Sequence, residues 1–257
     1  MSLLRRLRDT GLKSLYCKSP YHFYRLYDAI RAISKVEIEV GGTARTLHPA
    51  SELELLRWNR IRTKEPETIA WIDTFKTPGL FLDIGANVGV YSVYALIKHP
   101  ALQVVSLEPE PNNFYRLADN LNRTAPDRAA AYPLAASDST QLCRLQQSNP
   151  EGIGVAHNQI QNRDVAKGVG CMAFTVDDLV EHLGMPSYIK IDVDGIEQQI
   201  IQGMEKTLAS PGLLSVLVEV YLAEAPVIDE LLKAKGFLLT KVSAKNGLNR
   251  IYHRRSD

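Results

Sequence analysis

The spacing of hydrophobic positions changes near residue 80, and this change divides the chain into two regions. Upstream, residues 36–47 hold two short runs on either side of a Gly-Gly turn, which predicts a two-stranded hairpin. Residues 51–76 have apolar positions at helical spacing. We therefore expect a helical and hairpin extension over residues 1–77 and a main domain over residues 78–257.

In the main domain, short apolar runs alternate with segments of helical spacing. The predicted strands are residues 80–84, 102–107, 130–136, 188–193 and 213–220, followed by a hairpin of residues 237–242 and 248–252 around Asn246-Gly247. The predicted helices are residues 88–98, 112–122, 196–208 and 224–235. Strands that alternate with helices indicate an α/β fold with a doubly wound, mostly parallel sheet.

Residues 141–174 interrupt this alternation. Two segments, 142–145 and 169–174, could pair as strands, and a long polar stretch lies between them. Connections of this length in a compact domain are usually functional or disordered. We expect an insertion on the substrate side of the domain, and it contains His157, a candidate general base that is otherwise a solvated loop residue.

Composition excludes several classes of protein. Hydrophobic residues are 45% of the chain and charged residues 23%, which is a globular mixture, and the net charge of +1 gives no electrostatic case for nucleic-acid binding. No apolar run reaches the roughly 18 residues of a membrane span, and arginines stand where a signal peptide needs an apolar core. The three cysteines form no CxxC pair, which argues against a zinc site or a disulfide framework and favours a cytoplasmic location.

Positive charge is concentrated at the N-terminus, where residues 1–35 carry eight Lys or Arg and two Asp. Leucines from Leu3 to Leu15 lie near one face of a predicted helix, with arginines opposite. Such a helix could bind a membrane surface or a partner protein, or it could dock on this protein with a solvated basic face. Residues 1–50 carry no motif with a chemical interpretation.

The turn after the first strand of the main domain is the clearest candidate for ligand binding. In the sequence Asp83 to Gly89, Gly85 allows a tight turn and Gly89 allows a helix to pack closely on a strand. A dinucleotide fingerprint would also need glycines at the positions of Asn87 and Val90, which argues against NAD or FAD. The turn instead suits a ligand with an amino-acid moiety and a ribose but no phosphate, such as S-adenosylmethionine.

Acidic residues follow the next two predicted strands. Glu108 comes 19 residues after Gly89, where an acid normally meets ribose hydroxyls, and a carboxylate can accept from both hydroxyls at once. Its alternative role is to cap a helix. Asp138 could accept from the amino group of an adenine, or it could be a solvated turn residue.

Seven short motifs lie in a fixed order along residues 60–222. They are EPET (65–68), FLDIGANVGVYS (81–92), LEPEPNNF (107–114), AASD (135–138), TVDDL (175–179), KIDVDGIE (190–197) and LVEVY (217–221). The series resembles the FkbM-type S-adenosylmethionine-dependent methyltransferases. The resemblance implies a seven-stranded, Rossmann-like methyltransferase sheet with an antiparallel last strand. It also implies that the cofactor is held by Asp83, Gly85, Asn87, Gly89, Glu108 and Asp138, and to these we add Ala86 and Asp192.

One position departs from the family's pattern. The family usually has Asp-Val-Glu-Gly-His-Glu after the fourth strand, whereas residues 192–197 have Asp194 in place of Glu and Ile196 in place of His. The change at Ile196 removes the most obvious titratable group of the motif. It therefore puts in doubt any mechanism that relies on this histidine.

Methyl transfer to a hydroxyl requires loss of a proton, which calls for a general base or a metal ion. Asp192 and Asp194 are expected on one face of a strand, and Glu219 ends the neighbouring strand, so these carboxylates could position the acceptor, act as a base or hold a divalent cation. We favour Asp192, Glu219 and His157 as catalytic residues, with no metal. Glu197 is expected to cap a helix. Arg57 and Arg60 could line the acceptor site or lie on the surface.

The sequence thus predicts an S-adenosylmethionine-dependent methyltransferase that acts on a hydroxyl of a sugar, glycan or natural product. The acceptor class follows from the resemblance alone. A non-catalytic regulatory protein that keeps the cofactor fold is the alternative favoured by Ile196, and a nicotinamide oxidoreductase would have to bind NAD(P). The choice between O- and N-methylation and the oligomeric state are not predicted.

Overall fold

The protein is described from a computed structural model. The described residues are 19–76, 78–150, 152–156, 159–161, 168–243 and 248–255. The helix predicted between Leu3 and Leu15, the loop residue His157 and the Asn246-Gly247 turn lie outside them. Within the described part of the chain, no helix is both long enough and apolar enough to cross a membrane.

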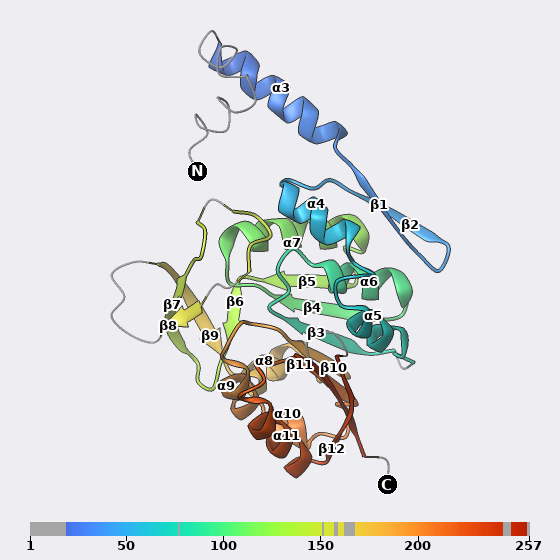
Figure 1. Ribbon diagram of the computed structural model, residues 1–257, viewed down its shortest axis with the longest axis vertical. Helices are drawn as coiled ribbons and strands as arrows, with labels where there is room; N and C mark the ends of the chain where they lie inside the picture. Colours follow the sequence, from blue (N-terminus) through green and yellow to red (C-terminus); the bar gives the residue numbers. More distant parts are fainter. Residues whose placement is uncertain are drawn as a thin grey trace.

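A seven-stranded sheet forms the centre of the fold (Figure 1). Its strands, in spatial order, are β12 (Phe237–Val242), β13 (Asn249–Arg254), β11 (Ser215–Glu219), β10 (Tyr188–Ile191), β3 (Leu80–Ile84), β4 (Gln103–Leu107) and β5 (Ala129–Tyr132). β13 runs antiparallel to both of its neighbours, and the other adjacent pairs are parallel. This arrangement confirms the predicted doubly wound α/β sheet that ends in an antiparallel hairpin.

Helices cover both faces of this sheet. One layer consists of α4 (Glu52–Asn59), α5 (Pro66–Asp73), α6 (Val90–Lys98) and α7 (Pro111–Thr124), and the other of α8 (Val176–Leu183), α9 (Glu197–Gln202), α10 (Glu205–Ala209) and α11 (Ala225–Ala234). Side chains alternate along a strand, so Phe81 of β3 packs into the first core and Leu82 into the second. Strands buried on both faces explain the continuous apolar runs of the sequence.

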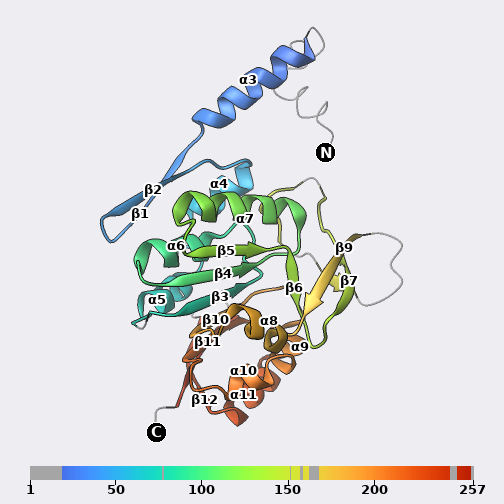
Figure 2. The same cartoon turned by 180° about the vertical axis from the view of Figure 1, so that it is seen from behind.

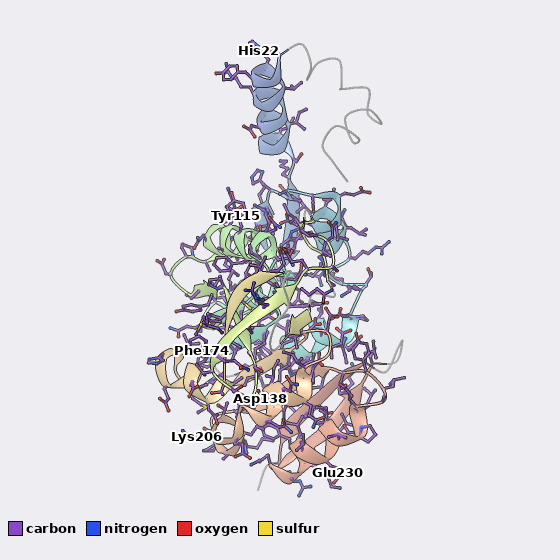
Figure 3. The ribbon with its side chains drawn as sticks, turned by 90° about the vertical axis from the view of Figure 1, so that its left-hand side faces the viewer. His22, Tyr115, Asp138, Phe174, Lys206 and Glu230 are labelled. Atoms are coloured by element: carbon purple, nitrogen blue, oxygen red, sulfur yellow. The ribbon has the colours of Figure 1, made fainter. Side chains whose placement is uncertain are left out.

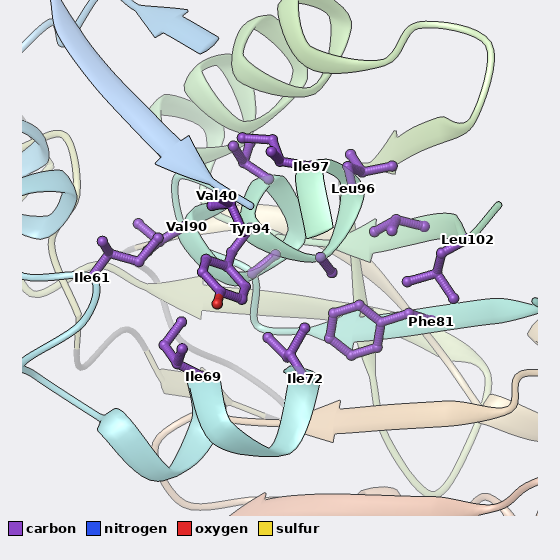
Figure 4. Close-up of a cluster of buried hydrophobic side chains, with 14 of the residues drawn as sticks. Val40, Ile61, Ile69, Ile72, Phe81, Val90, Tyr94, Leu96, Ile97 and Leu102 are labelled. Carbon is purple, nitrogen blue, oxygen red and sulfur yellow. The ribbon is translucent and has the colours of Figure 1, made fainter. Parts of the chain in front are cut away.

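The hairpin of β1 (Val36–Val40) and β2 (Thr43–Leu47) has the predicted bounds and packs on α6. Figure 4 shows Val40 of the hairpin in the same buried cluster as Ile72 of α5, Phe81 of β3 and Tyr94 of α6. The helix α3 (Pro20–Ile33) extends away from this body (Figure 1). The division of the chain at residue 77 stays a prediction, although apolar side chains from both sides of it share one core.

Two elements that were predicted as continuous are divided in the structure. The predicted strand 130–136 is interrupted at Pro133, which has no N–H to donate within a sheet, so β5 ends there and β6 (Leu134–Ala136) joins a different sheet. The predicted helix 196–208 is interrupted at Gly203, between α9 and α10. A Cβ at Gly203 would lie 2.2 Å from the carbonyl oxygen of Ser137, so the chain needs glycine at this point.

The insertion forms a second sheet with the strand order β6-β9-β7-β8, where β7 is Gln141–Gln146, β8 is Gln159–Gln161 and β9 is Val169–Phe174. The antiparallel pairing of β7 with β9 confirms the predicted pairing. Figure 2 shows this smaller sheet beyond the ends of β3, β4 and β5. The insertion is therefore placed beside the edge of the main sheet at which the parallel strands end.

Cys143 of β7 and Cys171 of β9 are opposite each other in register, and their Sγ atoms lie 2.9 Å apart. Both are free thiols. The sequence separation of the two cysteines did not predict this proximity. Opposed residues of an antiparallel pair have a Cα separation of about 4.5–5.5 Å, which is compatible with a disulfide.

We expect a mild thiol oxidant such as diamide to join Cys143 to Cys171, with the two thiol protons and two electrons passing to the oxidant. The bond should raise the free energy of unfolding by up to about 3 kcal/mol, because it restricts the unfolded chain. Mass spectrometry of an unreduced digest and thermal unfolding measure both effects, with Cys143→Ala as the unlinked control. Recovery of both thiols unchanged after oxidation would contradict this expectation.

Candidate active site

The strand order of the main sheet reverses at β3, because β4 lies on one side of it and β10 on the other. Ligands of open α/β sheets bind at such a point, beyond the carboxyl ends of the strands. A cavity of about 310 Å³ lies there, and its walls come from the turns after β3, β4 and β10, from β6, from the end of β11 and from residues 155–156 of the insertion. This volume is typical of a small-molecule site.

The turn after β3 is held against the turn after β10. Gly85 has a φ of +77°, and a Cβ on it would lie 1.9 Å from the carbonyl oxygen of Asp192, so only glycine fits. The N–H groups of Gly85 and Ala86 both donate to the carbonyl of Leu107 at 3.0 Å. Asn87 follows at a φ of +53°, a backbone conformation that Asn adopts more readily than most residues. Three strand ends therefore meet at one turn.

Glu108 presents a buried carboxylate to this cavity and is 5% exposed. Its oxygens accept hydrogen bonds from the N–H groups of Asn87 at 2.8 Å and Glu110 at 2.9 Å. Burial raises the pKa of Glu108 to about 7, although these two N–H groups partly offset it. Each carboxylate oxygen can accept a further bond, so Glu108 could hold ribose hydroxyls. The capping role falls instead to Glu110, which accepts from the Asn113 N–H at the start of α7.

Four of the predicted cofactor residues do not line the cavity. Ala86 is buried in the turn after β3. Asp83 is fully buried beneath it, accepts from the Ser92 hydroxyl and lies 3.9 Å from the Lys190 ammonium. Gly89 begins α6. Asp138 is exposed (Figure 3), and its carboxylate accepts hydrogen bonds from the neighbouring hydroxyls of Ser137 and Ser139.

The cavity has an apolar wall in the part where Asp138 was expected to contact an adenine base. They are Pro109, Leu134, Ala135, Ala136 and Leu145. The small alanine side chains leave room for a flat ring, and the leucines supply apolar contacts to it. This part of the cavity suits an adenine base by contact rather than by a carboxylate.

Residues 152–156 of the insertion lie across the cavity and are held there through their backbone. Arg57 of α4 donates from Nε to the Gly154 carbonyl at 2.7 Å, and the Gly154 N–H donates to Oδ1 of Asn113 at 2.7 Å. Asn87 and Asn113 both donate to the carbonyl of Val155, at 2.9 and 3.1 Å. Val155 and Ala156 of the insertion therefore line the cavity, whereas a role of the insertion at the substrate stays a prediction and His157 is outside the described residues.

Three carboxylates converge at the other end of the cavity. Oxygens of Glu65, Asp192 and Glu219 lie within 4.8 Å of one another. Burial opposes the ionisation of Asp192, but the ammonium of Lys190, 2.6 Å away, outweighs it and lowers the pKa of Asp192. Burial and the negative charges of Asp192 and Glu65 raise the pKa of Glu219 to about 8. At neutral pH the cluster can therefore hold a proton on Glu219 beside an ionised Asp192.

Sequence reasoning placed Asp194 in this cluster and missed Glu65. β10 ends at Ile191, and Asp194 has a φ of +64°, so Asp192 and Asp194 do not share a strand face as predicted. Asp194 lines the cavity without joining the three carboxylates. Glu65 precedes α5 and belongs to the EPET motif, which was the only signal for it.

Glu197 lies in the first turn of α9, but its side chain does not cap that helix as was expected and bonds instead to the turn before it. Its carboxylate accepts from the N–H of Gly195 at 3.1 Å and from that of Val193 at 3.4 Å, at the start of α9. Burial raises the pKa of Glu197. Its oxygens are therefore engaged by the turn that carries Asp194.

A doubly wound sheet with a reversed last strand and a cavity beyond β3 is the architecture of the Rossmann-like methyltransferases. The methyltransferase FkbM domain matches residues 83–239, so the chain belongs to the FkbM methyltransferase family. It is an S-adenosylmethionine-dependent methyltransferase.

Three proteins illustrate what the chain is similar to. Hexuronic acid methyltransferase AglP of Haloferax volcanii is 24% identical over 210 residues, which are 81% of this chain and 83% of that protein. AMB antimetabolite synthetase AmbE of Pseudomonas aeruginosa is 25% identical over 198 residues, which are 61% of this chain and 9% of that protein. The crystal structure of precorrin-6y C5,15-methyltransferase from Geobacter metallireducens superposes with a TM-score of 0.46 at 16% identity, over 74% of this chain and 87% of that one.

The residues around the cavity fit S-adenosylmethionine. Glu108 offers a buried acceptor for hydroxyl groups, the glycine turn allows close approach of a ligand to backbone, and the apolar wall suits a base. Asp192, at the opposite end from the apolar wall, offers a carboxylate for an ammonium group. Each portion of the cofactor therefore has a chemically matched part of the wall.

We expect Glu108→Gln to weaken binding of S-adenosylhomocysteine by roughly 1.5–3 kcal/mol, because charge-assisted hydrogen bonds to the ribose are lost. Only the ionised carboxylate accepts from both hydroxyls, so wild-type affinity should rise as the pH increases through about 7 and then level off. Calorimetry on both sides of that pH measures this. The variant should lose the pH dependence, and Glu181→Gln on the exposed surface of α8 should keep it. Equal affinities of the wild type and Glu108→Gln would remove Glu108 from the ribose site.

Proposed function

We propose that this chain transfers a methyl group to a hydroxyl oxygen of a sugar. S-adenosylmethionine, when bound, supplies the methyl group as an electrophile. The observation that carries the proposal is the carboxylate cluster beside the cavity, in which Asp192 and Glu219 line the wall and the pKa of Glu219 is raised to about 8. A sugar acceptor is supported by the similarity to a hexuronic acid methyltransferase.

In this proposal the cofactor is held by the turn of Gly85 to Asn87, by Glu108 and by the apolar wall. The segment 152–156 shields part of the cavity from water, and five hydrogen bonds with α4, α7, Asn87 and the residue before α4 hold it in place. Exclusion of water strengthens the charge interactions inside the site. The acceptor enters from the side of Asp192, Asp194 and Glu219.

Glu219 is the general base of the proposed reaction. A base with a pKa near the working pH gives the best compromise between being ionised and being basic, and burial next to Asp192 and Glu65 gives Glu219 this property. As the acceptor oxygen gains the methyl group, its proton passes to the carboxylate of Glu219. Asp192 stays ionised because of Lys190, and its charge keeps Glu219 basic.

The proposal includes no metal ion. The oxygens of Glu65, Asp192 and Glu219 have the chemistry of a divalent-cation site. The ammonium of Lys190, however, already supplies a positive charge 2.6 Å from Asp192. The location in the cytoplasm and the small-molecule or glycan acceptor, which were expected from the sequence, also stay predictions.

The acceptor class is tested with cofactor labelled on the methyl group and a panel of a hexuronic acid glycoside, a neutral hexose glycoside and a phenol. We expect label in a sugar product that survives mild alkali, because a methyl ether is stable where a methyl ester hydrolyses. Label lost in alkali would move the reaction from the hydroxyl to a carboxylate oxygen. Label found only in the phenol would overturn the sugar assignment.

We expect Glu219→Gln to lower kcat by about 100-fold or more, since general-base catalysis contributes about that much, while affinity for S-adenosylhomocysteine stays within a few-fold. For the wild type, kcat/KM should rise with pH through about 8, and this rise should be absent in the variant. Glu230→Gln on the exposed face of α11 is the matched control (Figure 3). Loss of wild-type activity in EDTA would instead assign the carboxylates to a metal ion.

A further inference from the structure

A small hollow of about 30 Å³ adjoins the cofactor cavity on the side of α4. The two share Arg57, Gly85 and Asp192 in their walls. Arg60, just after α4, and Lys190 also line the hollow. It therefore adjoins the turn after β3, where the amino-acid end of the cofactor would lie if Glu108 holds the ribose.

The charges around this hollow call for an anion. Within the described part of the chain, no carboxylate forms an ion pair with Arg57 or Arg60. Arg57 donates from Nε to the Gly154 carbonyl. Its two terminal nitrogens can therefore donate to another group. Lys64 and Lys190 also line the hollow, but Lys64 is paired with Glu65 and Lys190 with Asp192, so the positive charge that calls for an anion is that of the two arginines. Arginine is the side chain whose planar fork matches a carboxylate best.

The size of the hollow limits the anion. A volume of 30 Å³ accommodates roughly two water molecules. A carboxylate group is of this size, whereas a sugar ring is several times larger. The hollow therefore fits one end of a ligand whose remainder lies in the larger cavity.

Contacts with α7 fix the position of α4, and with it Arg57 and the following Arg60. Glu54 of α4 is fully buried and pairs with Nε of Arg116 on α7 at 2.9 Å. Asn120 of α7 donates to the same carboxylate at 3.1 Å. Arg57 and Arg60 lie upstream of residues 83–239, so the family match assigns them no role.

We propose that Arg57 and Arg60 bind the α-carboxylate of the methionine moiety of S-adenosylmethionine, and that Asp192 binds its α-ammonium group. The inference rests on the proposed binding of the cofactor in the adjoining cavity. It gives the N-terminal extension a direct part in cofactor binding. In this proposal the two arginines bind the cofactor and do not recognise a charged acceptor.

The test compares binding of S-adenosylmethionine with binding of its decarboxylated analogue, by calorimetry and without an acceptor. The wild type should prefer the carboxylated form by about tenfold or more, because charge-assisted hydrogen bonds are at stake. Arg60→Gln and Arg57→Gln should weaken binding of S-adenosylmethionine and leave binding of the analogue unchanged. Because Arg60 is exposed, its substitution should leave the fold intact. Arg60→Gln is therefore informative even if Arg57→Gln unfolds the covering segment.

Arg62→Gln is the matched control, because Arg62 donates to the Glu39 carbonyl at 2.9 Å and lines neither cavity. It should keep the wild-type preference. Equal effects of Arg60→Gln on both ligands, or no effect on either, would overturn the proposal. Unchanged cofactor binding with a raised KM for an acidic acceptor would overturn it too, and would assign the arginines to the acceptor. Failure of the wild type to bind either ligand would instead refute cofactor binding in the cavity.

Discussion

The contact between the turns after β3 and β10 is the constraint on which the site depends. The Asp192 N–H donates to the Ile84 carbonyl at 3.1 Å, and Gly85 leaves no room for a side chain against the Asp192 carbonyl. This contact places the turn that could hold the cofactor directly against the carboxylates that could act on the acceptor. Any Cβ at position 85 would push the two turns apart, and the part of the cavity wall that they form together would be lost. One backbone contact thus fixes the relation between cofactor and base.

A buried lysine makes the carboxylate cluster possible. Lys190 lies within β10, where an isolated charge would be costly. It is offset by Asp192 at 2.6 Å and Asp83 at 3.9 Å, and the Tyr91 ring is 5.1 Å from its ammonium. Asp83 therefore supports the site from below as a counter-charge, which is a different role from the direct cofactor contact that its motif suggested. Because Lys190 keeps Asp192 ionised, the negative charge of Asp192 acts together with burial to raise the pKa of Glu219 to about 8.

Local signals in the sequence were enough for most of the fold, and non-local contacts account for what they missed. Strands buried on both faces have continuous apolar runs, so β3, β10 and β11 could be predicted with bounds close to those observed. The turn of Gly85 and the acid Glu108 were likewise recognisable. Glu65 was not, because it meets Asp192 only after α5 packs on the sheet, and the Cys143 pair depends on the register of two strands in the insertion. The spacing of residues along a chain does not show which distant side chains meet after folding.

The covering segment shows how the extension and the domain become one site. The side chains of Ser51, Arg57, Asn87 and Asn113 all hydrogen-bond with backbone atoms of residues 153–155, and in one of these bonds the Gly154 N–H is the donor. Backbone contacts do not depend on which side chains the segment carries. The bonds to residues 153 and 155 therefore require no particular side chain there, whereas Gly154 has a φ of +80°, which favours glycine. α4 is required for that closure, so a cavity built from the matched domain alone would lose two of the groups that hold its cover, Ser51 and Arg57.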